Sequence, residues 1–288
     1  MTAIDMRVRV PREKNIKHPY DMMDYYQKRA GFDLRYGVTD KVLLEEMAAA
    51  SIDMAVVHSE WEIEEPAILN DHVAELVRRY PDKFLAVVSV DPREGITQSL
   101  QNLKSAVGTT RCVGLSLQPA FLDMLPEDAR FYPLYQYCEE RGLPVWLHSG
   151  INYAPNHSIE ADRPIHFERI LIDFPRIRVV ACHAAWPWVG EACALARKFS
   201  PRLFLEIGGV APKYIFRNGT GWDPFLHFAN SILQDQVILG TDWPIIPFQR
   251  AIKEINEAPL KDAVKHKILH ENGLRLIHET LNGRPEDH

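Results

Sequence analysis

Short runs of hydrophobic residues alternate along this chain with segments in which hydrophobic residues recur every three or four positions. The short runs predict β-strands, and the periodic segments predict amphipathic helices. The expected strands lie at 4–10, 54–58, 84–90, 112–117, 144–148, 178–182, 203–206 and 237–241. The expected helices lie at 69–80, 96–107, 131–138, 191–199 and 261–279, the last segment holding one or two closing helices. Strands and helices therefore alternate through most of the chain.

One more helix is predicted from its end signals. Asp162 can cap the first turn, because a carboxylate accepts hydrogen bonds from the N–H groups that are free there. Pro164 suits the first helical turn, and Pro175 limits the far end. The sequence therefore predicts a helix between the fifth and sixth strands, with Asp162 as its cap.

This order of elements predicts a parallel sheet, because parallel neighbours need a crossover connection, which is usually a helix. Eight such units in about 250 residues match a closed (β/α)₈ barrel of the TIM type. A doubly wound open sheet is the alternative, but no Gly-rich phosphate loop follows the first strand to support it. We expect one α/β barrel domain over 1–288, in which 11–40 could form a cap over the mouth and 261–288 hold the closing helices.

Composition narrows the class of protein. The 288 residues carry a net charge of −6, with 46% hydrophobic and 25% charged residues, which is typical of globular domains. The negative charge argues against nucleic-acid or membrane-surface partners, and no hydrophobic run approaches the ~20 residues of a membrane span. Four cysteines lie far apart without a Cys-x-x-Cys pair, so neither disulfides nor a zinc ribbon are indicated. With no recognisable signal peptide, we expect a reduced cytoplasmic protein.

Polar side chains follow or end several of the predicted strands. They are His58, Ser116, His148, His183, Glu206 and Asp242. Barrels of this type place their chemistry at the carboxyl ends of the strands. A single histidine there would more often be a hydrogen-bonded core residue, but several titratable groups at one rim favour an active site.

The first strand combines charged and hydrophobic positions. Asp5, Arg7 and Arg9 alternate with Ile4, Met6, Val8 and Val10. We expect the hydrophobic set to face the helices and the charged set to face the barrel interior. A buried arginine needs a partner, so one interpretation is an internal ion pair of Asp5 with Arg7, or of Asp242 with either arginine. The other is an anion clamp, because a guanidinium matches a carboxylate in two-point geometry. Both interpretations can hold together.

An ordered set of short motifs resembles a known family. The motifs are Leu147-His148-Ser149-Gly150, Arg163-Pro164-Ile165-His166, Asp173-Phe174-Pro175, Val179-Val180-Ala181-Cys182-His183, Trp186-Pro187-Trp188, Leu205-Glu206-Ile207-Gly208-Gly209, Leu239-Gly240-Thr241-Asp242-Trp243-Pro244 and Glu271-Asn272-Gly273. Together they resemble the amidohydrolase-related family that includes aminocarboxymuconate-semialdehyde decarboxylase. The resemblance implies a distorted (β/α)₈ barrel. It also implies decarboxylation, hydrolysis or hydration of a small, often aromatic carboxylate, with one divalent metal, commonly zinc. Family members often form dimers, so the resemblance suggests a homodimer.

The family's metal ligands match this sequence only in part. His148, His183 and Asp242 stand at the positions of the family's ligands on the fifth, sixth and eighth strands. Where the family has a His-x-His pair on the first strand, this chain has Arg7-Val8-Arg9. A guanidinium has no lone pair to donate and repels a dication. The two arginines therefore favour a metal-free site over one in which the three matching residues hold zinc.

Our first hypothesis is an enzyme of this family that acts on a small organic anion by hydrolysis or by C–C cleavage, including decarboxylation. Arg7 and Arg9 would hold the substrate's carboxylate, and Asp242 would be the general base. His148 and His183 would polarise or protonate the substrate. Further substrate-binding candidates are His58, Glu206, Trp186 and Trp243, although the two tryptophans could equally pack beneath loops.

Two alternatives remain open at this point. One is a conventional metal-dependent hydrolase or decarboxylase that uses His148, His183 and Asp242 as ligands. The other is a catalytically silent barrel that binds a small anion or a partner protein, which the loss of the first-strand histidines would explain. The presence of all three matching residues argues against a silent barrel.

Overall fold

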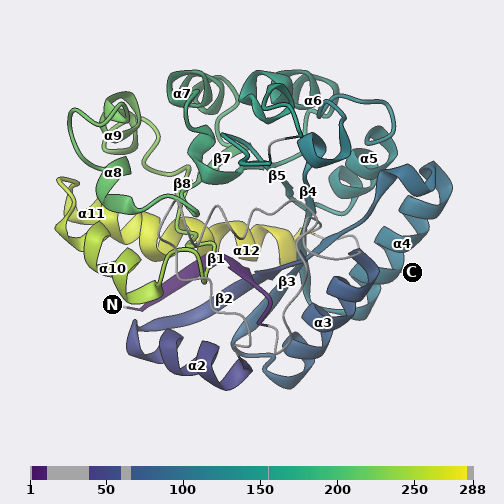
Figure 1. Ribbon diagram of the computed structural model, residues 1–288, viewed down its shortest axis with the longest axis horizontal. Helices are drawn as coiled ribbons and strands as arrows, with labels where there is room; N and C mark the ends of the chain where they lie inside the picture. Colours follow the sequence, from purple (N-terminus) through teal and green to yellow (C-terminus); the bar gives the residue numbers. More distant parts are fainter. Residues whose placement is uncertain (1, 12–38, 60–65, 155, 284–288) are drawn as a thin grey trace.

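The computed structural model describes residues 2–11, 39–59, 66–154 and 156–283, and it confirms the predicted (β/α)₈ barrel. The strands lie close to their predicted positions. They are β1 (Ala3–Arg9), β2 (Ile52–His58), β3 (Phe84–Ser89), β4 (Cys112–Leu117), β5 (Val145–Leu147), β6 (Val179–Ala181), β7 (Leu203–Glu206) and β8 (Val237–Ile238). They pair in chain order, and every neighbouring pair is parallel (Figure 1).

Helices follow the strands and surround the sheet (Figure 1). The α-helices are α2 (Asp40–Ala49), α3 (Pro66–Arg79), α4 (Ile96–Thr109), α5 (Tyr132–Glu140), α6 (Phe167–Asp173), α7 (Val189–Lys198), α8 (Pro212–Ile215), α9 (Asp223–Ala229), α10 (Phe248–Glu257), α11 (Asp262–His266) and α12 (Asn272–Asn282). Short turns are η2 (Pro92–Glu94), η3 (Pro119–Leu122), η4 (Glu160–Asp162), η5 (Pro164–His166), η6 (Cys182–Ala185) and the π-helical turn η7 (Lys267–Glu271). Each helix predicted from the sequence has a counterpart among these elements.

The first strand and the segment after β8 close the barrel. Met6 N donates to Leu239 O at 2.9 Å, and Arg9 N donates to Trp243 O at 3.0 Å. In the other direction, Asp242 N donates to Arg7 O at 2.9 Å. The candidate residues of β1 and of the β8 turn are therefore fixed side by side by backbone hydrogen bonds.

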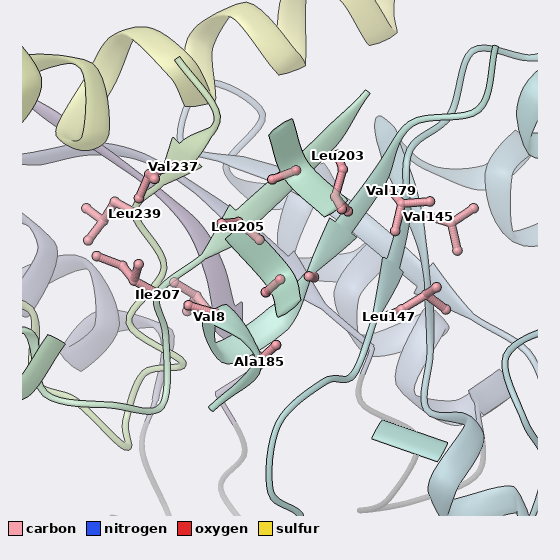
Figure 2. Close-up of a cluster of buried hydrophobic side chains, with 14 of the residues drawn as sticks. Val8, Val145, Leu147, Val179, Ala185, Leu203, Leu205, Ile207, Val237 and Leu239 are labelled. Carbon is pink, nitrogen blue, oxygen red and sulfur yellow. The ribbon is translucent and has the colours of Figure 1, made fainter. Parts of the chain in front are cut away.

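Two hydrophobic clusters separate the inside of the barrel from its outside. The outer cluster packs between the strands and the surrounding helices, and Figure 2 shows part of it around Val8, Leu205 and Leu239. The interior cluster takes side chains from all eight strands and from α12. Its buried members are Ile4, Met6, Val56, Leu85, Val87, Val113, Trp146, Val180, Cys182, Phe204, Ile238, Leu276 and Ile277. Because Leu276 and Ile277 pack there, α12 contributes to the interior packing of the barrel.

The first strand departs from the predicted alternation. Ile4 and Met6 belong to the interior cluster, whereas Val8 belongs to the outer cluster. The prediction that all three face the helices is therefore wrong for Ile4 and Met6. The physical reason is a register shift between Asp5 and Val8, where β1 advances three residues against two on β2.

The remaining sequence predictions concern the chain as a whole. The predicted cap at 11–40 lies outside the described residues except at its two ends. The single-domain assignment of 1–288 includes that segment and stays a prediction. Among the described residues, none of the helices has the length and apolar character needed to cross a membrane.

Candidate active site

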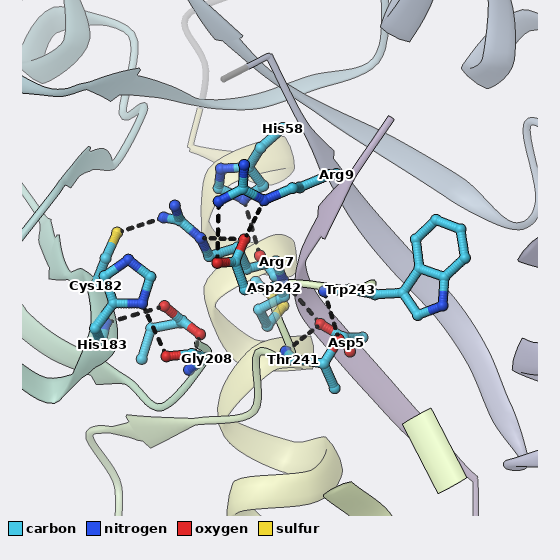
Figure 3. A network of polar contacts seen from close by, with 12 residues as sticks. Asp5, Arg7, Arg9, His58, Cys182, His183, Gly208, Thr241, Asp242 and Trp243 are labelled. Atoms are coloured by element: carbon cyan, nitrogen blue, oxygen red, sulfur yellow. Dashed lines mark hydrogen bonds and ion pairs between the residues drawn. The ribbon is translucent and has the colours of Figure 1, made fainter. Parts of the chain in front are cut away.

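Arg7, Arg9 and Asp242 form a largely buried cluster inside the barrel mouth, shown in Figure 3. Arg9 makes a two-point contact with Asp242, from Nε to Oδ1 at 2.9 Å and from Nη2 to Oδ2 at 3.2 Å. Arg7 Nε donates to the same Oδ1 at 3.4 Å. The Arg7 and Asp242 side chains are each 1% exposed, whereas that of Arg9 is 15% exposed. The predicted ion pairing of Asp242 with an arginine is therefore present, and both arginines take part. We call Arg7 and Arg9 the guanidinium pair.

The charges of the guanidinium pair set the protonation state of Asp242. Burial alone would raise the pKa of this carboxyl, but Arg9 and Arg7 outweigh that effect and hold the pKa below its usual range. Asp242 is therefore ionised at neutral pH and is a weak base. Its backbone φ of 55° lies in the left-handed region, a strained conformation that hydrogen bonds on both sides maintain.

Asp5 supports the turn that carries Asp242. Its Oδ1 accepts from Arg7 N at 3.0 Å and from Thr241 N at 3.2 Å, so it joins β1 to the residue before Asp242. The side chain is fully buried, and desolvation raises the pKa of Asp5 to about 7, although these N–H groups favour the ionised form. Asp5 therefore has a positioning role beneath the cluster.

His183 follows the end of β6 and lies near the guanidinium pair. Its Nδ1 donates to Gly208 O at 2.8 Å, because a carbonyl oxygen can only accept. This contact leaves the lone pair on Nε2. Burial, together with the charge of Arg7, lowers the pKa of His183 well below its usual value, so the ring is neutral. Arg7 Nη1 also donates to the Sγ of Cys182, the preceding residue, at 2.8 Å.

Glu206, at the end of β7, supports the turn that carries His183. Its carboxylate accepts from His183 N at 3.3 Å and from Gly208 N. It is fully buried, and desolvation raises the pKa of Glu206 to about 7. A side chain at Gly240 would collide with this carboxylate, so the glycine provides the space that Glu206 needs. Glu206 thus acts below the site, on the backbone of the left-handed turn at His183 and Ala184.

His148 pairs with a carboxylate that the sequence analysis assigned to another role. Its Nδ1 lies 2.7 Å from Asp162 Oδ1, and Asn152 Nδ2 donates to Asp162 Oδ2 at 2.6 Å. Asp162 is fully buried and ends η4. The prediction that Asp162 caps the following helix is wrong, because α6 begins after His166 and has no side-chain cap. The sequence signal that could have indicated this pairing is an acidic residue in the loop that follows a strand-end histidine.

The two imidazoles at the ends of β5 and β6 lie side by side. The ring centroids of His148 and His183 are 5.0 Å apart. Phe121 packs on the other side of His148, with its ring centroid at 5.6 Å. His148 is 8% exposed and is therefore almost completely shielded from solvent. The structure thus brings together five of the predicted site residues, namely Arg7, Arg9, His148, His183 and Asp242.

The other predicted substrate-binding residues occupy different environments. His58 is fully buried with Nε2 3.0 Å from Met6 O, and burial lowers its pKa well below the usual value. Trp243 is 2% exposed, its ring stacks on Phe248, and Figure 3 shows it pointing away from Asp242. This placement corresponds to the packing alternative. Trp186 is 36% exposed.

The donor set does not fit a divalent metal. Of the three matching ligands, Asp242 has both carboxylate oxygens engaged by guanidinium N–H groups. Across the part of the chain that the structure describes, no three histidine, cysteine, aspartate or glutamate side chains are grouped so that they could hold an ion. A catalytic zinc site normally has three protein ligands, and a guanidinium cannot be one of them.

Comparisons with known proteins place the chain in a family. A 2-amino-3-carboxymuconate-6-semialdehyde decarboxylase from Dictyostelium discoideum is 23% identical over 242 residues, which is 73% of this chain and 65% of that protein. An uncharacterised TIM-barrel protein from Bordetella bronchiseptica has a TM-score of 0.79 and 29% identity, covering 99% of this chain and 100% of that chain. A 5-carboxyvanillate decarboxylase from Novosphingobium aromaticivorans, complexed with manganese and 4-hydroxy-3-methoxy-5-nitrobenzoic acid, has a TM-score of 0.69 and 13% identity, covering 96% of each chain. Residues 4–278 match the amidohydrolase family, and the chain belongs to it.

Proposed function

We propose that this protein is an enzyme that hydrolyses a small carboxylate-bearing substrate, aromatic or unsaturated, at the barrel mouth. One observation carries the proposal. A buried histidine–carboxylate pair and the partly exposed guanidinium pair meet at one rim through His183, whose ring centroid lies 5.0 Å from that of His148. A base and a preorganised positive charge are the two groups that acyl hydrolysis requires.

His148 is the proposed general base. The carboxylate oxygen of Asp162 accepts the hydrogen bond in the 2.7 Å contact, so His148 Nδ1 carries the proton. The lone pair is then on Nε2, the atom that can take a proton from water. Asn152 holds the second oxygen of Asp162, so the carboxylate is fixed at both ends. This arrangement follows the general logic of a base oriented by a third group.

The guanidinium pair is the proposed site for negative charge. Arg9 is the more exposed member, so we assign it the direct contact with the substrate, while Arg7 lies deeper. Asp242 holds both side chains in place. The sequence analysis predicted Asp242 as the base, but its lowered pKa makes it a poor proton acceptor at neutral pH. We therefore assign it an orienting role.

The reaction is balanced without further groups. Water loses a proton to His148 Nε2 as its oxygen attacks the carbonyl carbon of an ester, lactone or amide. The negative charge that develops on the carbonyl oxygen is stabilised by the guanidinium pair. When the bond to the leaving group breaks, His148 returns the proton to that group.

Decarboxylation is the second candidate reaction, favoured by the similarity to the decarboxylase from Dictyostelium discoideum. In that reaction the C–C bond to the carboxylate breaks, carbon dioxide leaves, and the remaining carbon takes up a proton. His148 can deliver that proton after its Nε2 has taken one up from solvent, and the neutral ring of His183 packs beside it. The same residues thus serve both reactions, and the product distinguishes them.

An assay with two readouts tests the proposal. Purified protein is incubated with carboxylate-bearing esters and lactones while acid release is measured, and with hydroxybenzoates while carbon dioxide is measured. We expect acid release that His148→Gln abolishes and that His278→Gln, at an exposed position, leaves intact. Carbon dioxide release with the same dependence would support decarboxylation. Carboxylate binding without either product would support the silent barrel, and turnover unaffected by His148→Gln would remove His148 as the base.

A further inference from the structure

The Arg7 guanidinium contacts Asp242, which the family resemblance assigns as a metal ligand, and Cys182, the residue before the second assigned ligand His183. From β1 it reaches Asp242 Oδ1 at 3.4 Å and, through Nη1, Cys182 Sγ at 2.8 Å. Cys182 immediately precedes His183, so this one side chain spans from the turn after β8 to the end of β6 (Figure 3). At 1% exposure, its charge lies within the barrel mouth and not above it.

The carboxylate that a metal would need is already committed. Arg9 holds both oxygens of Asp242 in a two-point contact at 2.9 and 3.2 Å, and Arg7 shares the nearer oxygen. Such paired, charge-assisted contacts are the strongest hydrogen bonds a carboxylate makes with a side chain. An ion that bound Asp242 would compete with the guanidinium pair for these oxygens and would lie close to both positive charges.

Electrostatic repulsion also opposes the binding of a metal ion. Each guanidinium keeps its positive charge at all accessible pH values, so both would repel a dication placed among His148, His183 and Asp242. The repulsion is strong because water screens charges poorly inside a buried site. The same positive charge attracts an anion, so what excludes a metal favours a carboxylate ligand.

We propose that the Arg7 guanidinium is a built-in cation that takes the position of the family's divalent ion, so that this protein does not bind zinc or manganese at its barrel mouth. The proposal rests on the proposed function, in which the Arg7 guanidinium supplies the positive charge near the reacting carbonyl. Arg9 and Asp242 act as its support: Arg9 fixes the carboxylate, and the carboxylate orients Arg7.

Zinc affinity is the measurement that tests this proposal, and it needs no substrate. Zinc would be titrated against a competing chelating dye for the parent and for three variants. Arg7→His with Arg9→His introduces two neutral donors two residues apart on one strand, and we expect zinc binding at least about 100-fold tighter than in the parent. Arg7→Gln with Arg9→Gln removes charge without adding strong donors, and we expect a smaller gain. Arg130→His, at an exposed position, controls for adding a histidine and should bind zinc like the parent.

Clear results would overturn the proposal. Equal zinc affinity in the parent and the double histidine variant would show that the arginines do not govern metal binding. A gain for the histidine variant with none for the glutamine variant would assign the exclusion to missing donors instead of to charge. Purified parent protein carrying about one zinc or manganese per chain would also contradict it.

If the variants at Arg7 and Arg9 fail to fold, measurements on the parent protein alone still test the proposal. We expect its melting temperature to be unchanged by zinc and by a strong chelator, since a ligand that does not bind the folded state cannot stabilise it. A rise with zinc, or a fall with the chelator, would overturn the proposal. These measurements do not depend on turnover, so they test metal exclusion alone. The product assays test the hydrolysis proposal separately.

Discussion

Replacing Asp5 by asparagine should change how the stability of the protein depends on pH. Asp5 is fully buried, and its pKa in the folded protein is raised to about 7 from the ordinary 3.8. Asparagine has nearly the same shape, and its carbonyl oxygen can still accept from Arg7 N and Thr241 N. The substitution therefore removes a titrating group while keeping the backbone contacts.

The sign follows from proton binding. Between pH 3.8 and about 7 the folded protein holds a proton on Asp5 that the unfolded chain has lost. In this range the free energy of unfolding falls as the pH rises, so the stabilisation is complete below 3.8 and lost above about 7. Each tenfold difference in proton affinity corresponds to about 1.4 kcal/mol, so the full difference is on the order of 4 kcal/mol. In the asparagine variant the free energy of unfolding does not fall for this reason as the pH rises.

Urea unfolding of both proteins from about pH 5 to about pH 8.5 measures the effect. The stability of Asp5→Asn relative to the parent should rise with pH by a few kcal/mol and then level off above about pH 7. Glu206 titrates in the same direction and is present in both proteins, so only its electrostatic coupling to Asp5 enters the difference. Asp82→Asn, at an exposed position, should give a flat difference. A flat or falling difference for Asp5→Asn would refute the assignment of a raised pKa.

Three further predictions test the site. Asp162→Asn should lower kcat by ~10²–10⁴. The Asn152 amide donates to the new carbonyl oxygen, so the new NH₂ donates to His148 Nδ1 and the imidazole lone pair moves away from Nε2. Gly240→Ala should destabilise the fold by ~1–3 kcal/mol, because the new methyl group collides with the buried Glu206 carboxylate. Benzoate should raise the melting temperature more than benzamide does, because the guanidinium pair favours an anion.

Each of these predictions has its own control. Asp128→Asn changes a half-buried carboxylate outside the site and should leave kcat intact, so an equal loss in both aspartate variants would remove Asp162 from the proton-transfer machinery. Gly190 has open space around it in α7, so Gly190→Ala should be neutral or slightly stabilising. If Gly240→Ala is equally harmless, Glu206 is not held where the structure places it. Equal thermal shifts for acid and amide would contradict an anion site.

The strands were predictable because their burial leaves a strong signal. Barrel strands such as β3 and β4 are buried on both faces, so they appear in the sequence as continuous hydrophobic runs. The strand-end residues His148, His183 and Asp242 were predictable for a related reason: each breaks such a run at its carboxyl end. Local patterns of this kind require no knowledge of which distant segments meet.

Two residues whose roles the sequence assigned incorrectly or left open depend on distant contacts. Asp162 precedes a helix and has the chemistry of a cap, yet its carboxylate bonds to His148 from the preceding strand end. Trp243 follows the motif strand, yet the backbone turn at Asp242 directs its ring toward Phe248 on α10. Both outcomes depend on the path of a loop, which leaves no periodic trace in the sequence.

The irregularity in β1 links the packing of the barrel to its chemistry. A strand that alternated strictly would place Arg7 and Arg9 on the opposite face from Ile4 and Met6. The structure instead turns all four toward the interior: the two hydrophobic side chains join the interior cluster, and the two guanidinium groups reach Asp242. The register shift after Asp5 makes this possible, because it lets consecutive residues face the same side. One strand can therefore belong to the sealed core at its beginning and to the charged mouth at its end, with Asp5 bonded to the backbone at the point where the two meet.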